Sequence, residues 1–145
     1  MTRTVVVAPL LVAFGSGVAT LAVGSRPALQ RATSVAGVAA YAAAVAVLAW
    51  TVVLGPDAPG AAVYQVGAVP APFGITLVVD ALSAFMLALA AAVALFAVVV
   101  SVRFVDRRNQ RTYYHPTFQL LLVGVTGAFL TGDLFNLFEI GRAHV

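Results

Sequence analysis

The sequence predicts an all-α membrane protein with four transmembrane helices, the start of a fifth, and a small external β-hairpin between the second and third helices. Hydrophobic residues make up 62% of the 145 residues and charged residues only 9%, whereas soluble domains are about 25% charged. The apolar residues also gather in runs long enough to cross a hydrocarbon core roughly 30 Å thick. We therefore divide the chain by membrane spans and not by soluble domains.

The first two spans are predicted at residues 5–23 and 34–54, joined by a polar connector at residues 25–32. A signal peptide is the alternative for the first run, but its apolar core would be shorter. The Gly15-Ser16-Gly17 step lacks the strand and the lysine of a phosphate loop, so we expect a packing notch. In the second run, close helix packing is expected along a stripe of small residues, Ala36, Ala40 and Ala44.

A Pro- and Gly-rich stretch, residues 55–72, separates the second span from the third. The β-prone runs Val63–Val66 and Ile75–Val79 flank a Pro/Gly-rich connection, which predicts a hairpin on the membrane surface. Asp80 then stands where an N-cap is needed, and the third helix is predicted at residues 81–102.

The fourth span is predicted at residues 116–131, with Pro116 in its first turn, where the missing N–H costs nothing. Gly124, Ala128 and Gly132 repeat at four-residue spacing, which predicts a groove for another membrane helix. Gly132 suits the position just past a helix end, and Asp133 suits the N-cap of a fifth helix beginning at residue 134. Because a short helix cannot end facing lipid, we expect neighbouring helices or water to shelter this end.

The arginines predict the orientation. The connectors after the first and third helices hold Arg26, Arg31, Arg103, Arg107, Arg108 and Arg111, whereas the opposite side holds only Arg3. Since cytoplasmic loops carry the excess of basic residues, the N-terminus and the hairpin are expected outside.

A resemblance becomes specific in the string TFQLLLVGVTGAFLTGDLFNLF with its preceding HP, and in the upstream PAPFGITLVVDALSAFM. Both resemble the D subunit of the Mrp-type multisubunit monovalent cation/proton antiporters, which is similar to the antiporter-like subunits of NADH:quinone oxidoreductase. The resemblance covers Thr4 to Phe138. It implies an N-terminal fragment of a multi-pass subunit of the bacterial inner membrane, with other membrane subunits, the lipid bilayer, Na⁺ and H⁺ as partners.

Three residues are candidates for structural or ion-receiving roles. Asp80 and Asp133 are each either a helix cap or an outer carboxylate in an ion path. His115 is either a solvated interfacial residue or a proton relay, because its ordinary pKa lies near about 6.5. Gln119 and Thr126 are expected to bond across helices. The arginine cluster is expected to set topology, with anionic-lipid contact as a secondary role.

No catalytic, cofactor-binding or metal-binding set is recognisable in the sequence, and no Cys is present. The arginines form no aromatic-interleaved patch of the kind that binds nucleic acid. We therefore do not expect an enzyme, and the resemblance implies a secondary-transport subunit. Two alternatives remain open: a proton-translocating subunit of NADH:quinone oxidoreductase, and a structural membrane subunit with no ion path.

The last seven residues, EIGRAHV, are expected to be non-native. They are what the sequencing-adapter string agatcggaagagcacacgtc encodes when one native g precedes it. In the resembling family, TGDLFNLF is followed by Val-Phe-Phe-Glu, so Arg142 falls where that Glu would stand. We therefore assign no proton-path role to Glu139, and we expect the native helices to occupy residues 1–138.

Overall fold

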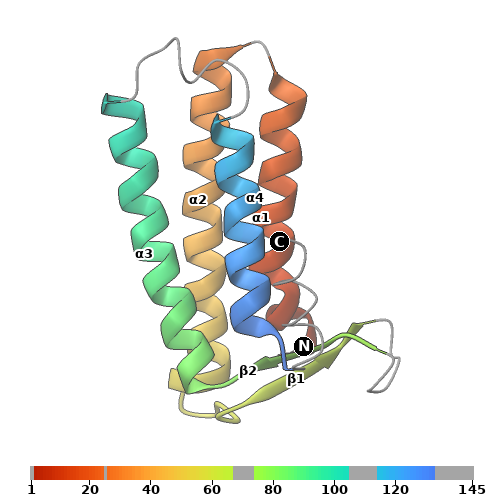
Figure 1. The fold of residues 1–145 in the computed structure, drawn as a ribbon. Coiled ribbons are helices and arrows are strands. Elements are labelled where there is room, and N and C mark those ends of the chain that lie inside the picture. Colours follow the sequence, from red (N-terminus) through yellow and green to blue (C-terminus); the bar gives the residue numbers. More distant parts are fainter. Residues whose placement is uncertain (1, 25, 67–73, 105–113, 133–145) are drawn as a thin grey trace.

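Four helices run side by side, with a two-stranded sheet across one end of the bundle (Figure 1). The computed structural model describes residues 2–24, 26–66, 74–104 and 114–132. The helices are α1 (Thr2–Val23), α2 (Pro27–Ala49), α3 (Ala81–Phe104) and α4 (Tyr114–Leu130). By length and composition three of them, over Thr4–Val23, Pro27–Leu54 and Ala81–Arg103, could cross a membrane. With 17 residues, α4 is shorter.

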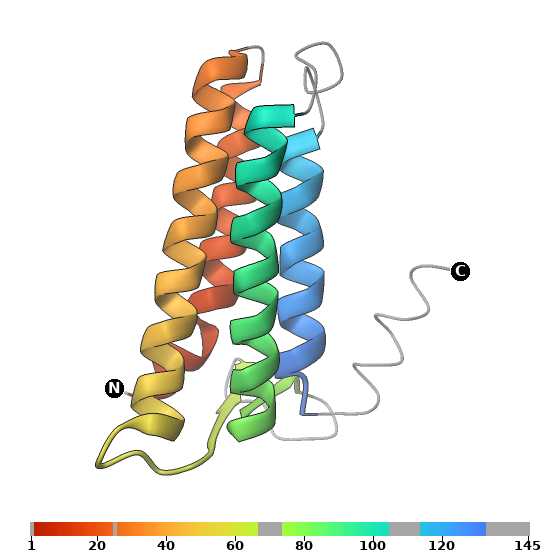
Figure 2. The same cartoon turned by 90° about the vertical axis from the view of Figure 1, so that its left-hand side faces the viewer.

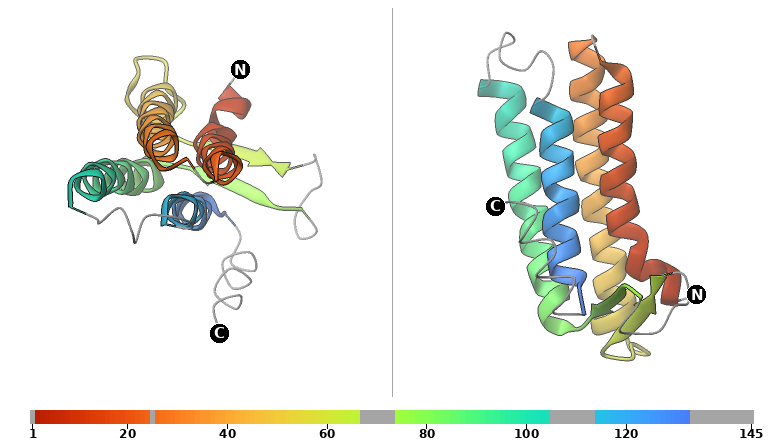
Figure 3. Two further views of the ribbon diagram at one scale, coloured as in Figure 1. Left: turned by 90° about the horizontal axis from the view of Figure 1, so that it is seen from above. Right: turned by 45° about the vertical axis from the view of Figure 1, so that its right-hand side comes forward.

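The two ends of the bundle differ in character. The sheet lies where α2 and α4 end and α3 begins, and we call this the hairpin end (Figure 2). Arg26, Arg31 and Arg103 lie at the other end, which we call the arginine end. In the view along the helices, α4 lies beside α1 and α3, and α2 faces it across the bundle (Figure 3).

The second helix begins at Pro27, so the prediction of a connector as far as residue 32 was wrong. Proline fits the first helical position because its φ is already helical and it has no N–H to satisfy. Gly24, at φ +45°, turns the chain after α1. Gln30 is 1% exposed and its Nε2 donates to the Thr20 carbonyl at 3.3 Å, which bonds one helix end to the other.

The predicted end of this helix at residue 54 is confirmed, although its last turn is a π-helix, η1 (Trp50–Leu54). The Gly55 N–H donates to the Trp50 carbonyl at 2.8 Å, five residues back. A Cβ on Gly55 would lie 2.8 Å from that oxygen, so the wide turn requires glycine there.

The predicted hairpin is confirmed as strands β1 (Ala62–Gln65) and β2 (Thr76–Val79), paired antiparallel with Ala62 opposite Val79. Leu77 and Val79 are 4% and 0% exposed, whereas Val63 is 54% exposed. One face of the hairpin therefore covers the apolar core of the bundle, and α1 and β1 contact each other directly.

The end of α4 is held by this hairpin. The Gly132 N–H donates to the Thr76 carbonyl at 2.9 Å, and Thr131 forms a β-bridge with Leu77. A Cβ on Gly132 would collide with the Val78 side chain. Gly132 is not among the residues with positive φ, so its backbone conformation does not require glycine. Glycine is needed here because the chain approaches β2 closely. The expectation that this helix end is sheltered therefore holds, but strand β2, rather than a helix, shelters it.

The predicted small-residue faces are not the ones that pack inside the bundle. Ala36 and Ala40 are exposed on α2, and a Cβ on Gly124 would meet nothing within 4 Å. Gly37 makes the close contact instead, since a Cβ there would lie 2.5 Å from the Ser16 Cβ. A Cβ on Gly17 would lie at an ordinary contact distance, 3.5 Å from the Cβ of Gln119, and one on Gly15 would meet nothing within 4 Å, so the tight contact is at Gly37 and not in the predicted notch of α1.

Candidate functional site

Asp80 is the N-cap of α3, as predicted. Its Oδ1 accepts from the Ser83 N–H at 2.8 Å, and the Ser83 Oγ accepts from the Asp80 N–H at 2.8 Å. This reciprocal pair satisfies backbone donors that the first turn of a helix leaves open. Hydrogen bonds from the Ser83 backbone N–H, and then from its hydroxyl, hold the pKa of Asp80 below its usual value. The carboxylate is therefore ionised at neutral pH.

A shallow recess of about 470 Å³ opens beside this cap at the hairpin end. Asp80 and Ser83 line one side, and Phe129, Thr131 and Gly132 line the other. Asp80 is itself exposed to solvent. Asp133, the second carboxylate candidate, lies outside the described residues, as do the fifth helix predicted from residue 134 and the tail 139–145.

His115 lies inside α4 and is only 1% exposed, so the expectation of a solvated interfacial histidine was wrong. The helix begins at Tyr114, two residues earlier than predicted, and this places the imidazole on the buried face. The Tyr114 ring meets it edge-on, with centroids 5.2 Å apart. Neither ring nitrogen has a hydrogen-bond partner among the described residues.

Gln119 bonds across helices, as predicted. It is fully buried, its Oε1 accepts from the Ser16 hydroxyl of α1 at 3.0 Å, and its Nε2 donates to the Ser34 carbonyl of α2 at 3.2 Å. One side chain on α4 thus connects both neighbouring helices.

Thr126 confirms the same prediction two turns further along α4. Its hydroxyl donates to the Leu122 carbonyl at 2.7 Å, which leaves its oxygen to accept from the Tyr41 hydroxyl of α2 at 2.9 Å. Both side chains are fully buried. We call these interhelical contacts the polar seam, formed by Ser16, Ser34, Tyr41, Gln119 and Thr126.

The members of the seam on α1 and α2 were not identified from the sequence. Tyr41 is one aromatic residue among alanines, and Ser34 is the first residue of the apolar run predicted as the second span. One signal was present: Ser34 and Tyr41 are seven residues apart, as are Gln119 and Thr126, so each pair shares a helix face.

The polar seam contains only neutral side chains. Among the described residues no group of three His, Asp or Glu could hold a metal ion. The ionisable candidates also stand apart, because Asp80 lies at the hairpin end and His115 at the arginine end. The hydrogen bonds between helices in the described part of the chain are thus made by uncharged groups.

Comparison with known proteins identifies D subunits of cation/proton antiporters among the relatives of this chain. The chain is 35% identical over 138 residues to the D subunit of the Na(+)/H(+) antiporter of Alkalihalophilus pseudofirmus, covering 94% of this chain and 27% of that protein. It is 54% identical over 80 residues to the D subunit of a probable K(+)/H(+) antiporter of Rhizobium meliloti, covering 55% and 14%. The D subunit of the Na(+)/H(+) antiporter of Bacillus subtilis is 39% identical over 74 residues, covering 51% and 15%.

No protein-family profile matches the chain. The matched region is about a quarter of the length of the relative that aligns with nearly the whole chain.

Proposed function

We propose that this chain, which is homologous to the D subunit of multisubunit cation/proton antiporters, is a membrane-embedded segment of such a subunit and supports exchange of a monovalent cation for protons by the assembled complex. The alignment over 138 residues carries the proposal. It covers 94% of this chain, and the uncovered remainder is shorter than any of the four helices.

In this proposal α4 is a fourth membrane span. Its 17 residues rise about 25 Å at 1.5 Å each, slightly less than a hydrocarbon core of roughly 30 Å. The bond from the Gly132 N–H to the Thr76 carbonyl and the bridge between Thr131 and Leu77 support it, because they occupy backbone groups that would otherwise face lipid. The positive-inside rule places the arginine end in the cytoplasm of a bacterial cell, with the N-terminus and the hairpin outside.

The role of this segment within the subunit is to hold helices together. The polar seam connects α4 to α1 and α2 with neutral groups, and no Asp, Glu, Lys, Arg or His lies midway along the four helices. The resemblance to antiporter-like subunits implies that later helices carry the ion path. Asp80 then acts as a cap, as its bonds with Ser83 support. Na⁺ or K⁺, H⁺ and the other membrane subunits are the partners of the whole complex.

The neutral interior also favours one alternative, a structural subunit that moves no ion. A chimera separates the two. Residues 1–138 would replace the aligned segment of the Alkalihalophilus pseudofirmus subunit, and the complex would be assayed in everted vesicles for proton efflux on addition of Na⁺ or K⁺. We expect efflux to persist. Assembly with the other subunits without efflux for either cation would contradict the proposal, and NADH-driven proton uptake into the vesicles by the chimeric complex would favour a quinone-linked subunit.

A further inference from the structure

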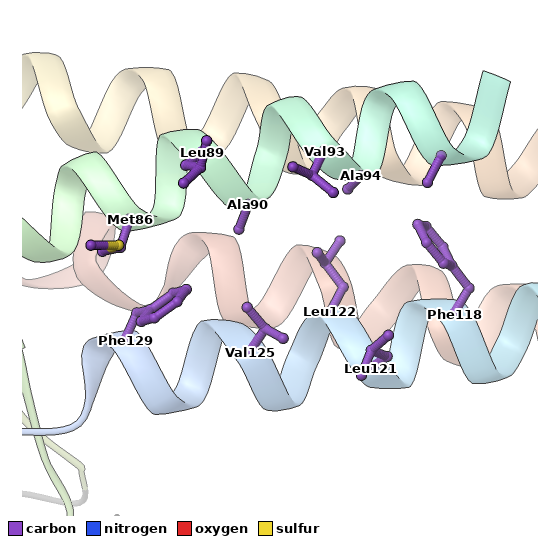
Figure 4. Close-up of a pocket in the computed structure, with 11 residues that line it drawn as sticks. Met86, Leu89, Ala90, Val93, Ala94, Phe118, Leu121, Leu122, Val125 and Phe129 are labelled. Atoms are coloured by element: carbon purple, nitrogen blue, oxygen red, sulfur yellow. The ribbon is translucent and has the colours of Figure 1, made fainter. Parts of the chain in front are cut away.

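An open groove of about 300 Å³ runs between α3 and α4 on the outer side of the bundle (Figure 4). Its floor is closed by Ala94 and Leu122, which are 4% and 6% exposed. Its walls are formed by Leu89, Val93 and Leu121, each more than half exposed. All its lining residues have apolar side chains, so an occupant needs no hydrogen bond from them.

The groove leads towards the arginine end. Phe118 stands at that end of the groove (Figure 4), and the ring of Tyr114 stacks on it with centroids 6.4 Å apart, which extends the wall by one turn. On α3, Arg103 lies six residues beyond the lining residue Ala97, about 9 Å further along the axis and about 120° round the helix, so it stands at the helix end near the groove without lining it. Its side chain is exposed.

The charges at this end favour an anion. Among the described residues the carboxylates are Asp57 and Asp80, and both lie at the hairpin end, a bundle length away. The arginine end is therefore positive wherever the structure describes it. Basic residues close to the cytoplasmic membrane surface attract anionic lipid headgroups.

The groove is also distinct from the face of α4 that suits another helix. Gly124 has open space around it and lies about 100° round the helix from the lining residue Val125. A further helix can approach closely at glycine, whereas the projecting side chains of Leu89 and Leu121 leave a channel between them that fits a flexible hydrocarbon chain.

We propose that this groove holds an acyl chain of an anionic phospholipid, whose phosphate lies at the arginine end against Arg103 and the Tyr114 hydroxyl. The inference rests on the proposed placement of the helices in a bilayer. It adds to the proposed function a bound lipid of negative charge that contacts both α3 and α4.

The test uses the full 145-residue chain in phosphatidylcholine bilayers, with Trp50, the single tryptophan, replaced by Phe. Leu121→Trp then places a tryptophan in the groove. The matched control is Val18→Trp, because Val18 is 48% exposed on α1, outside the groove. Phospholipids with brominated chains quench tryptophan on contact. We expect brominated phosphatidylglycerol to be preferred over brominated phosphatidylcholine at Leu121→Trp by roughly fivefold, as one interfacial arginine suggests, and no preference at Val18→Trp.

Two further variants test which arginine causes the preference for the anionic lipid. Arg103→Gln should abolish the preference, whereas Arg26→Gln, at the same end but in the α1–α2 connection, should leave it. Equal quenching by both lipids, or equal loss in both variants, would overturn the site. Quenching at Leu121→Trp that declines as the protein-to-lipid ratio rises would show that a second copy fills the groove instead. Absence of all quenching at Val18→Trp would refute the bilayer placement itself, and the lipid site with it.

Discussion

Replacing Gly37 with alanine tests how closely α1 and α2 approach each other. The new Cβ would lie 2.5 Å from the Ser16 Cβ, 3.0 Å from the Ser16 Oγ and 3.2 Å from the Gln119 Nε2. Both helices are constrained at this point, because Gln119 of α4 bonds to both of them. The helices must therefore separate to admit one methyl group.

The matched control is Gly124→Ala on α4, where a Cβ meets nothing within 4 Å. Both substitutions gain the same helix propensity, about 1 kcal/mol, so this gain cancels in their difference. Overpacking a core costs typically about 1–3 kcal/mol. We therefore expect Gly37→Ala to be less stable than Gly124→Ala by about 1–3 kcal/mol.

The measurement is unfolding of the full chain in mixed micelles by increasing the mole fraction of dodecyl sulfate, followed by circular dichroism at a helix band. A Ser16→Gly background removes the two nearest atoms, so Gly37→Ala should cost much less there, and the double-mutant cycle isolates that contact. Equal stabilities for Gly37→Ala and Gly124→Ala, or no coupling to Ser16→Gly, would refute the packing described here.

Three further predictions concern the cap, the topology and transport. Asp80→Asn should keep the start of α3 ordered and Asp80→Ala should not, and amide exchange at Ser83 would report the difference. Because the pKa of Asp80 is lowered in the folded protein, the stabilisation by its carboxylate is present above the ordinary carboxyl pKa and is lost as pH falls through the folded-state pKa. The Asp80→Asn variant should not show this loss. The chain has no cysteine, so Pro59→Cys should react with an impermeant maleimide on intact cells and Ala28→Cys only after permeabilisation; labelling of both from outside would exclude the proposed topology. Liposomes that contain only this chain should show no cation-driven proton flux, because no acid, lysine, arginine or histidine lies midway along the described helices, and measurable flux would contradict that reasoning.

The features that depend on neighbouring residues could be predicted before the helices were placed in space. Runs of apolar residues predicted the helices, a Pro- and Gly-rich break predicted the hairpin, and Asp80 was identified as a cap. Each of these is a local property, because a helix, a turn or an N-cap is satisfied by residues within a few positions of it. The connector that reached residue 32 was a local error of the same kind, since Pro27 is a helix start as much as a loop signal.

The helix faces that meet could not be predicted in the same way. Small residues permit close approach, but their spacing does not say which helix comes near, so Ala36 and Ala40 remained exposed while Gly37 made the contact. His115 became buried because α4 begins early and packs against α1 and α2. Gln119 of α4 bonds to Ser16 of α1, 103 positions away. Such contacts depend on how distant helices are brought together, and a reading of local patterns cannot supply that information.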